Sequence, residues 1–317
     1  MNTIPTTFNN TPAYTVVGGL ERRNSTGISA VVLNRGTPYN RTTLFEELGK
    51  YEFDYIVSLE GNRRRYDLDG LSASFPSVRF IVTSEEISRG EEINIAALEL
   101  TSAFFMVIWD DMRIQRKNTD SMAEKNQRLC TVPVIQNGKF ESLPTLIAPL
   151  VLKGQVKTYP FVFEKEGQPS LFPFDGIGLY ERECFLRLGG FDSSLKSFYW
   201  QLMDFGFRSH LWGEEIAASN TIKISYEGSI TPGDHTTGDS FRRFYLKNLA
   251  PVFRGDHANL PLRRFPGFLF RSKIGLFSAW EEFKQARQWV KTNQYRFRSD
   301  ARTVSELWGN IHEEETA

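Results

Sequence analysis

The sequence lacks an excess of charge of either sign, because 38 Lys and Arg residues balance 38 Asp and Glu residues. A general nucleic-acid binder neutralises phosphates with clustered cations, so this balance argues against nucleic acid as a partner. Cysteine is also scarce. The two cysteines, Cys130 and Cys184, exclude a disulfide-dense scaffold and a four-thiolate zinc site, and they fit a reducing compartment.

Long apolar runs are missing as well. No run reaches the roughly 18 residues that a membrane span needs. Residues 1–14 are polar and carry neither the basic segment nor the apolar segment of a signal peptide. We therefore expect a cytoplasmic protein whose contact with a membrane, at its inner face, is peripheral at most.

What is present is a globular composition: 40% of the 317 residues are hydrophobic and 24% are charged. Aromatic residues reach 14%, and we expect most of the 26 Phe in the core. Short β-branched runs predict strands, and the segments between them predict helices. The strands are expected at 28–33, 55–59, 78–83 and 104–109, and the helices at 43–48 and 91–102. This alternation predicts an α/β fold with a mostly parallel central sheet flanked by helices.

Composition divides the chain into three parts. Residues 1–26, rich in Thr, Asn and Pro, predict a loosely docked tail. Residues 27–255 predict the main domain, in which prolines between 120 and 175 favour loops and edge strands. Residues 256–317 predict a C-terminal helical extension that is aromatic and basic before an acidic end.

Polar or flexible residues follow three of the predicted strands: Asn34-Arg35-Gly36, Glu60-Gly61-Asn62 and Asp110-Asp111. In parallel sheets, ligands bind beyond the carboxyl ends of the strands, so these residues mark a candidate site. Asp110 and Asp111 can both approach one Mg²⁺ or Mn²⁺ ion at such a turn, because these cations take oxygen ligands. The alternative is a solvated turn or a helix cap.

Two further groups of residues are candidates for the site. Asp204 and Arg208 lie four residues apart on a predicted helix, where they either form a salt bridge or place Asp204 as a general base near Tyr199 and Trp200. His235, in a loop rich in Gly and Thr, is a candidate third ligand to a metal on Asp111.

The order of these pieces resembles a family 2 glycosyltransferase with the GT-A fold, over residues 27–250. The matching pieces are Ala30-Val31-Val32-Leu33, Pro38-Tyr39-Asn40-Arg41, Glu60, Arg89-Gly90, Trp109-Asp110-Asp111, Asp175-Gly176-Ile177-Gly178, Arg187 to Asp192, and His235-Thr236-Thr237-Gly238. Trp109-Asp110-Asp111 corresponds to the DxD metal motif of the family in an xDD form. The family usually carries Glu-Asp-x-Asp on a later helix, whereas this chain has Gln201-Leu202-Met203-Asp204.

The resemblance implies metal-dependent transfer of a hexose-type sugar from a nucleotide-diphosphate donor to a glycan, lipid-linked or protein acceptor, with inversion, as in polysaccharide biosynthesis. Glu60 would then contact the base or ribose, Arg89 the phosphates, and Asp111 a Mn²⁺ or Mg²⁺ ion together with Asp110 and His235. Trp200 would stack on the acceptor or donor. The base would be Asp204, or else Asp175 or Asp192, unless the protein transfers no sugar at all.

Two other functions compete with glycosyl transfer. A sugar-phosphate nucleotidyltransferase shares a related sheet, but Asn34-Arg35-Gly36 matches its glycine-rich signature only faintly. A non-catalytic nucleotide- or sugar-binding protein on the same scaffold would explain the missing Glu-Asp pair.

The basic and aromatic segment from Arg263 to Phe277 has three interpretations. Its cations alternate with phenylalanines, namely Arg263, Arg264, Arg271 and Lys273 with Phe265, Phe268, Phe270 and Phe277. This pattern is typical of an interfacial membrane helix, but it also suits a helix packed on the main domain or a contact in a homo-oligomer.

Overall fold

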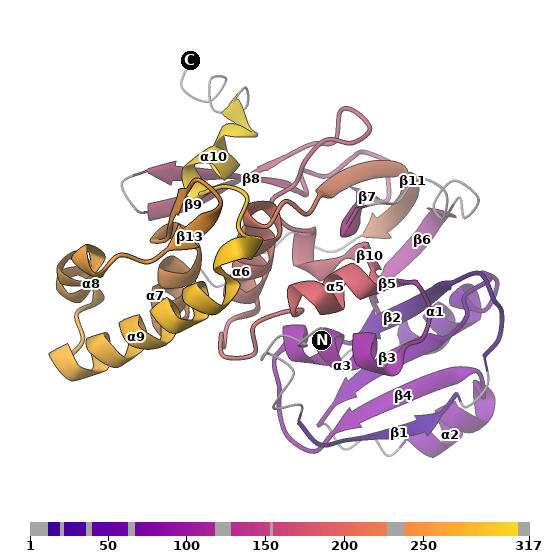
Figure 1. Cartoon of the computed structure of the whole chain (residues 1–317). Coiled ribbons are helices and arrows are strands. Elements are labelled where there is room, and N and C mark those ends of the chain that lie inside the picture. The colour runs from indigo at the N-terminus through magenta and orange to yellow at the C-terminus, as the bar shows by residue number, and fades with distance from the viewer. Residues whose placement is uncertain are drawn as a thin grey trace.

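The computed structural model describes residues 12–19, 22–35, 40–62, 67–117, 128–152, 155–226 and 238–309. Its centre is a nine-stranded sheet in the order β1-β4-β3-β2-β5-β10-β7-β11-β6 (Figure 1). The strands are β1 (Tyr14–Gly18), β2 (Ile28–Leu33), β3 (Ile56–Gly61), β4 (Val78–Thr83), β5 (Phe104–Trp109), β6 (Met112–Lys117), β7 (Cys130–Gln136), β10 (Gly178–Glu181) and β11 (Ile216–Tyr226).

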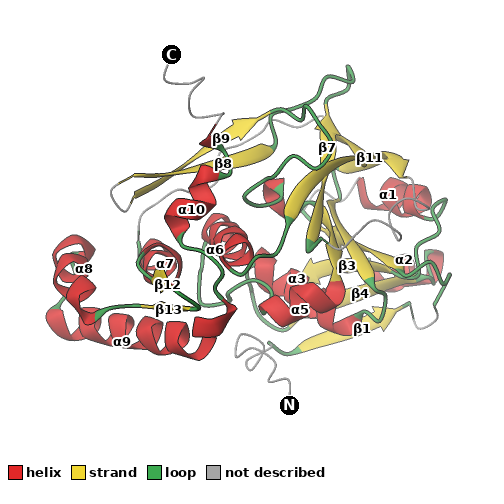
Figure 2. Ribbon diagram, turned by 45° about the horizontal axis from the view of Figure 1, so that its top comes forward, coloured by secondary structure: helices red, strands yellow, loops and turns green. Residues whose placement is uncertain are grey.

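Most strands of this sheet run in one direction. β2 is parallel to β3 and β5, β3 is parallel to β4, and β7 is parallel to β11. β1, β10 and β6 run the other way, since each is antiparallel to its neighbours. The predicted α/β fold with a mostly parallel central sheet is therefore confirmed. Helices flank this sheet, as expected (Figures 1 and 2).

The helices between the first parallel strands lie on both sides of the sheet. α1 (Asn40–Leu48) and α2 (Leu68–Ser74) lie on one side, and α3 (Arg89–Glu99) lies with α5 (Arg182–Leu188) on the other (Figures 1 and 2). The chain steps outward from β2 to β4 and then returns through α3 to β5, on the other side of β2. Because such crossovers are right-handed, this reversal moves α3 to the opposite face. It also makes the end of β2 beside β5 the switch point of the sheet, where ligands bind in such folds.

The central strands read as continuous apolar runs because both of their faces are covered. All six residues of β2 are buried, and the predicted ranges of β2, β4 and β5 match the observed ones. α3 begins two residues earlier than predicted, where Ser88 and Glu91 form a capping box. α5 ends at Gly189, whose φ of 96° suits glycine in a left-handed helix cap.

The second half of the chain adds a helical layer. α6 (Phe198–Leu211) packs against β11, and it is followed by α7 (Asp239–Phe244) with a π-helical turn, α8 (Phe265–Ser272), α9 (Leu276–Asn293) and α10 (Ala301–Glu306). Two hairpins, β8 (Leu146–Leu152) with β9 (Gln155–Phe161) and β12 (Val252–Arg254) with β13 (His257–Asn259), complete it. Among the described helices, none combines the length and the apolarity that a bilayer crossing demands.

One segment differs from the sequence prediction. Residues 1–26 predict a tail, whereas Tyr14–Gly18 forms β1 and pairs antiparallel with β4 at the edge of the sheet. The hydroxyl of Tyr14 donates a hydrogen bond of 2.5 Å to Glu99 of α3. The prediction rested on the composition of residues 1–26 as a whole, in which the short run Tyr14–Gly18 follows a stretch rich in Thr, Asn and Pro.

Candidate active site

Arg35 stands at the centre of a charged cluster beyond the switch point of the sheet. It follows β2, and its Nε atom lies 2.8 Å from Oδ2 of Asp111, which follows β5. Its Nη2 atom donates a hydrogen bond of 2.5 Å to Oδ2 of Asp175. The guanidinium lies 4.0 Å above the ring of Trp109, so a cation–π contact holds it in place. One arginine thus joins two carboxylates from distant parts of the chain.

The two consecutive aspartates after β5 have different surroundings. Asp110 is fully buried, and its Oδ1 atom accepts a hydrogen bond of 3.0 Å from the backbone N–H of Arg35. The side chain of Asp111 is 22% exposed and pairs with Arg35. Asp111 also has a buried oxygen, Oδ1, with no hydrogen-bond partner in the described part of the chain. Asp110 therefore organises the turn, while Asp111 faces the site.

Asp175 reaches the cluster from an unusual backbone conformation. It lies in a short 3-10 turn, Phe174–Gly176, with φ of 52° and ψ of 26°. Residues other than glycine rarely adopt this left-handed region, although Asp tolerates it better than most. The Trp109 indole holds the turn by donating a hydrogen bond of 3.0 Å to the Asp175 carbonyl. Burial raises the pKa of Asp175, and the attraction of Arg35 only partly opposes that rise.

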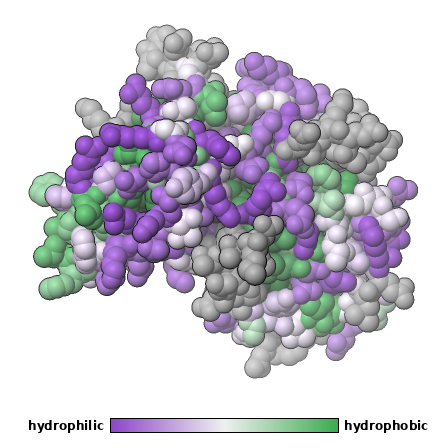
Figure 3. All heavy atoms as spheres, viewed as in Figure 1, coloured by the Kyte–Doolittle hydropathy of each residue, from purple (hydrophilic) through white to green (hydrophobic). Residues whose placement is uncertain are grey.

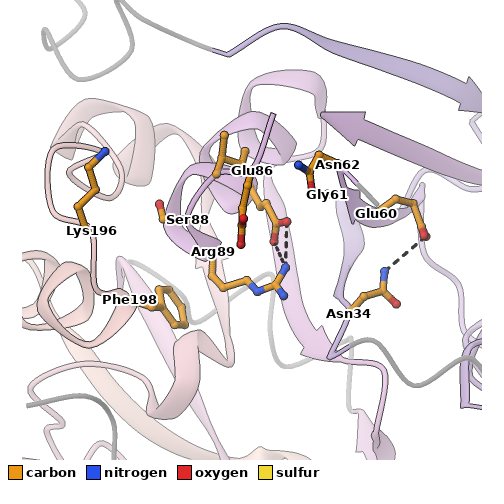
Figure 4. Close-up of a pocket in the computed structure, with 11 residues that line it drawn as sticks. Asn34, Glu60, Gly61, Asn62, Glu86, Ser88, Arg89, Lys196 and Phe198 are labelled. Carbon is orange, nitrogen blue, oxygen red and sulfur yellow. Dashed lines mark hydrogen bonds and ion pairs between the residues drawn. The ribbon is translucent and has the colours of Figure 1, made fainter. Parts of the chain in front are cut away.

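A polar cavity of about 210 Å³ opens next to this cluster, at the ends of β2 and β3 (Figure 4). Its lining comprises Asn34, Glu60, Gly61, Asn62, Glu86, Ile87, Ser88, Arg89, Glu92, Lys196 and Phe198. Figure 4 shows Asn34 and Glu60 on one side of the cavity, and Lys196 and Phe198 on the other. Four strand-end and helix-start segments therefore meet around one space of a size that suits part of a small ligand.

Two arginines organise the acidic residues of this cavity. Glu60 is buried, and its Oε2 atom lies 2.5 Å from Nη1 of Arg41, which is itself buried in α1. Arg89 pairs with Glu92 at 2.7 Å and also lies 5.6 Å from the Trp109 ring, so it connects the cavity with the Asp111–Asp175 cluster. Arg89 is the first residue of α3, where the exposed N–H groups of the helix favour an anion.

Asp204, predicted as a catalytic base, lies outside this cluster in a second group of charges. It has no solvent exposure, and its Oδ2 atom accepts hydrogen bonds from Arg208 at 2.9 and 3.1 Å. Its Oδ1 atom lies 2.8 Å from both Lys247 and Asn248. Burial opposes ionisation of Asp204, but the charges of Lys247 and Arg208 outweigh it and lower its pKa.

The other predicted residues of this region are also enclosed. Trp200 is buried, with its ring 5.2 Å from that of Phe241 and 5.4 Å from that of Phe244. Asp192 is buried, with Oδ2 at 2.6 Å from Lys247, and that charge with Arg243 lowers its pKa against the effect of burial. His235 lies outside the described residues.

Gln201 occupies a place in the packing where the family pattern has a carboxylate. Its Oε1 atom accepts a hydrogen bond of 3.2 Å from the N–H of Gly90, and its Nε2 atom donates one of 2.7 Å to Ser88. A Cβ atom on Gly90 would come within 2.5 Å of this amide. Gln201 therefore connects the start of α3 to α6 by hydrogen bonds, and this connection fixes the position of Arg89.

Sequence reasoning singled out Glu60, Arg89, Asp110 and Asp111, and the structure brings them to one edge of the sheet. It named Arg35 only as part of a strand end and Asp175 only as an alternative base. No local spacing reveals that these two residues meet, because they lie 140 positions apart. The left-handed conformation of Asp175 becomes visible only in the structure.

The carboxylates of the strand-end site are the candidate ligands of a metal ion. Within the described ranges, no group of three or more His, Cys, Asp or Glu side chains is arranged to hold one. The buried Oδ1 of Asp111 is nevertheless the type of oxygen that a hard divalent cation takes, so the chemistry of the residues present fits such an ion.

Comparison with known proteins identifies the fold. No protein-family model matches the chain, and no curated protein matches its sequence. Its structure is similar to GalNAc-T7 bound to UDP, GalNAc and Mn²⁺, with a TM-score of 0.56 and 14% identity over 70% of this chain. The match covers 48% of the GalNAc-T7 chain, so this chain spans less than two thirds of that protein. At this identity the likeness establishes a GT-A-like fold, as the sequence predicts, and nothing further.

Two weaker similarities are to bacterial and archaeal proteins. Residues 1–349 of TarS from S. aureus, bound to UDP-GlcNAc, match with a TM-score of 0.49 and 10% identity, over 82% of this chain and 71% of that one. The mannosyltransferase PcManGT from Pyrobaculum calidifontis, bound to GDP-Man and Mn²⁺, matches with a TM-score of 0.45 and 8% identity, over 83% of this chain and 69% of that one.

Proposed function

We propose that this protein is a glycosyltransferase that takes a sugar from a nucleotide-diphosphate donor. The observation that carries the proposal is the convergence, at the switch point of a GT-A-like sheet, of a polar cavity with the Arg35, Asp111 and Asp175 cluster. GalNAc-T7, whose fold is similar, was solved with UDP, GalNAc and Mn²⁺. A cavity beside a charged cluster offers what such a donor needs: a pocket for the nucleoside and fixed charges for the diphosphate.

The cavity is the proposed nucleoside site. Asn34 and Glu60 supply amide and carboxylate groups for hydrogen bonds to a base or ribose. The ion pair with Arg41 keeps Glu60 in position without ligand. Arg89, at the start of α3, is placed between the cavity and the cluster and is the proposed contact for the diphosphate.

Asp111 is the proposed principal ligand of a divalent cation, with Asp110 and His235 as supporting residues. Such an ion, when bound, stabilises negative charge on the leaving nucleoside diphosphate. Arg35 already holds one oxygen of Asp111, so the arginine and the cation would share this carboxylate.

We assign the role of general base to Asp175 in preference to Asp204. Asp175 faces the cluster with a partly exposed side chain and a raised pKa, whereas both oxygens of Asp204 are occupied in a buried network. In the proposed reaction, the acceptor hydroxyl transfers its proton to Asp175 while its oxygen attacks the anomeric carbon. The bond from that carbon to the diphosphate breaks, and the electron pair leaves with the nucleoside diphosphate, which inverts the anomeric centre.

Calorimetry with UDP, GDP and dTDP, each with and without Mn²⁺, tests the donor site. We expect one nucleotide to bind in a metal-dependent way and to lose that binding in Asp111→Ala. Asp256→Ala is the matched control, because Asp256 is an exposed aspartate on the turn between β12 and β13. If no nucleotide binds under any condition, the proposal is wrong.

A second candidate function, nucleotide or sugar binding without catalysis, is favoured by one observation. Gln201 and Asp204, on the helix where the family carries its base, both serve the packing of the fold. The two functions are distinguished by measuring the release of nucleoside diphosphate from a bound nucleotide sugar. Slow hydrolysis with release of the nucleoside diphosphate favours the glycosyltransferase. Tight binding with no release from any donor of the matching nucleotide favours the non-catalytic protein.

A further inference from the structure

The outermost helices of the C-terminal part form a hairpin. α8 and α9 are joined by residues 273–275, and Figure 1 shows them at one end of the molecule, away from the nine-stranded sheet. The two helices of the hairpin pack on each other through aromatic rings. The Phe265 ring lies 5.1 Å from Trp280 and 5.4 Å from Phe283, and Phe268 lies 6.2 Å from Phe283. The face between the two helices therefore already has its apolar contacts.

The outer face of this hairpin is also apolar. Phe270 is 90% exposed and Phe277 is 86% exposed, and each lies about one helical turn from the junction of the two helices. Leu262, Leu276 and Trp280 are exposed beside them in the sequence. Figure 3 shows hydrophobic residues gathered at the end of the molecule where Figure 1 places this hairpin. Exposing two phenylalanines almost completely to water is costly, and such patches mark interaction sites.

Cations surround these exposed aromatics. Arg263, Arg264, Arg271 and Lys273 are exposed, and no acidic residue lies between positions 262 and 280. Within the described ranges, these four side chains form no ion pair or hydrogen bond. Residues 262–280 thus carry four positive charges without a paired acid, while Glu281 and Glu282, which follow on α9, pair with Lys284 and Arg242.

We propose that the α8–α9 hairpin is a docking surface for an anionic lipid bilayer. Aromatic side chains at the junction would enter the boundary between headgroups and acyl chains, while the flanking cations contact anionic headgroups. A symmetric contact with a second copy would instead oppose four cations with four cations, which like-charge repulsion disfavours. The proposal does not depend on the function assigned to the strand-end site.

Vesicle co-sedimentation of the full chain tests this surface. We use neutral phosphatidylcholine vesicles and vesicles in which about a third of the lipid is phosphatidylglycerol. The wild-type chain should sediment with the anionic vesicles and much less with the neutral ones, and added salt should release it. Phe270→Ser with Phe277→Ser should weaken sedimentation by about tenfold or more, as should Arg271→Glu with Lys273→Glu.

Matched controls distinguish the surface from general stickiness or unfolding. Phe140→Ser removes another exposed phenylalanine, and Lys291→Glu with Arg302→Glu reverses two exposed charges at the far end of α9 and on α10. Both controls should sediment like the wild type, and the melting temperatures of all variants should agree. A wild-type chain that stays in the supernatant with anionic vesicles overturns the proposal. The proposal is also overturned if the wild-type chain is a dimer that binds no vesicles and the Phe270 and Phe277 changes convert this dimer to a monomer.

Discussion

Two groups of aspartates in this protein both pair with cations, but they differ in burial. In the strand-end cluster, Asp111 and Asp175 share Arg35, and both side chains are partly exposed. In the α6 cluster, Asp192 and Asp204 share Lys247, and all three are buried. Burial raises the pKa of Asp175, which has one cation between two carboxylates. Asp204 has an additional partner, Arg208, and its pKa is lowered.

The difference shows how placement separates a structural carboxylate from a reactive one. A buried aspartate whose oxygens are all bound to cations and amides stabilises the fold and has no lone pair for a substrate. An aspartate at a sheet edge, with one cation shared and solvent nearby, can exchange partners.

Asp204→Asn should give the largest loss of stability. The change leaves Arg208 and Lys247 buried with less compensating charge, so we expect the free energy of unfolding to fall by about 3–5 kcal/mol. Urea denaturation followed by circular dichroism measures it. A variant that unfolds like the wild type but has lost glycosyl transfer would restore Asp204 as the catalytic base.

Asp175→Asn should have the opposite profile. Its side chain is partly exposed, so we expect a change in unfolding free energy below about 1 kcal/mol. Release of nucleoside diphosphate from a bound donor should fall by about 100-fold or more, because the proton acceptor is missing. Calorimetry should show that nucleotide binding is retained. Unchanged release would show that Asp175 is not the base.

Lowering the pH should reduce the contribution of the α6 cluster to the free energy of unfolding. The pKa values of Asp192 and Asp204 are lower in the folded protein than in the unfolded chain, so their contribution to stability is complete above the unfolded value. It is lost progressively as the pH falls below about 4, the ordinary pKa of an aspartate in an unfolded chain. Asp175 has the reverse sign, because its raised pKa costs stability at neutral pH. Urea titrations between neutral and acid pH check this, and Asp204→Asn should flatten the dependence.

Arg35→Gln should give the smallest effect. The guanidinium on Oδ2 of Asp111 repels a cation on the same carboxylate, so its removal should raise the affinity for Mn²⁺ alone by less than about tenfold. Calorimetric titration of Mn²⁺ into the wild type and the variant measures this. Arg128→Gln is the control, because Arg128 pairs with Glu215 at a distance of 2.7 Å and not with a residue of the strand-end cluster. Weaker binding in Arg35→Gln would show that the arginine supports the cation instead of competing with it.

Local patterns were sufficient for much of the fold. The apolar runs at 28–33, 78–83 and 104–109 coincide with β2, β4 and β5, because buried parallel strands carry a continuous apolar signal. The capping residues of α3 and the glycine after α5 mark helix ends through their own hydrogen bonds and backbone preferences. The edge strand β1 was missed, because its five residues are a short run in a segment that is otherwise rich in Thr, Asn and Pro.

The candidate site was predicted less completely. Polar residues after predicted parallel strands had to share one edge of the sheet, which placed Glu60 and Asp111 together in advance. The four-residue spacing of Asp204 and Arg208 allowed a salt bridge or a base, and the structure shows the salt bridge. Nothing in the spacing indicates that Lys247 and Asn248 occupy the other oxygen of Asp204.

The central strands and the strand-end site follow from short-range signals, because periodicity and crossover connections act over a few residues or a single connection. The partners of each aspartate do not, since Arg35 reaches Asp175 across 140 positions and Lys247 reaches Asp192 across 55. The exposure of Phe270 and Phe277 likewise depends on which face of the hairpin packs inward. Burial and pairing are properties of the assembled core, and in this protein they separate the carboxylates that hold the fold from those placed to act.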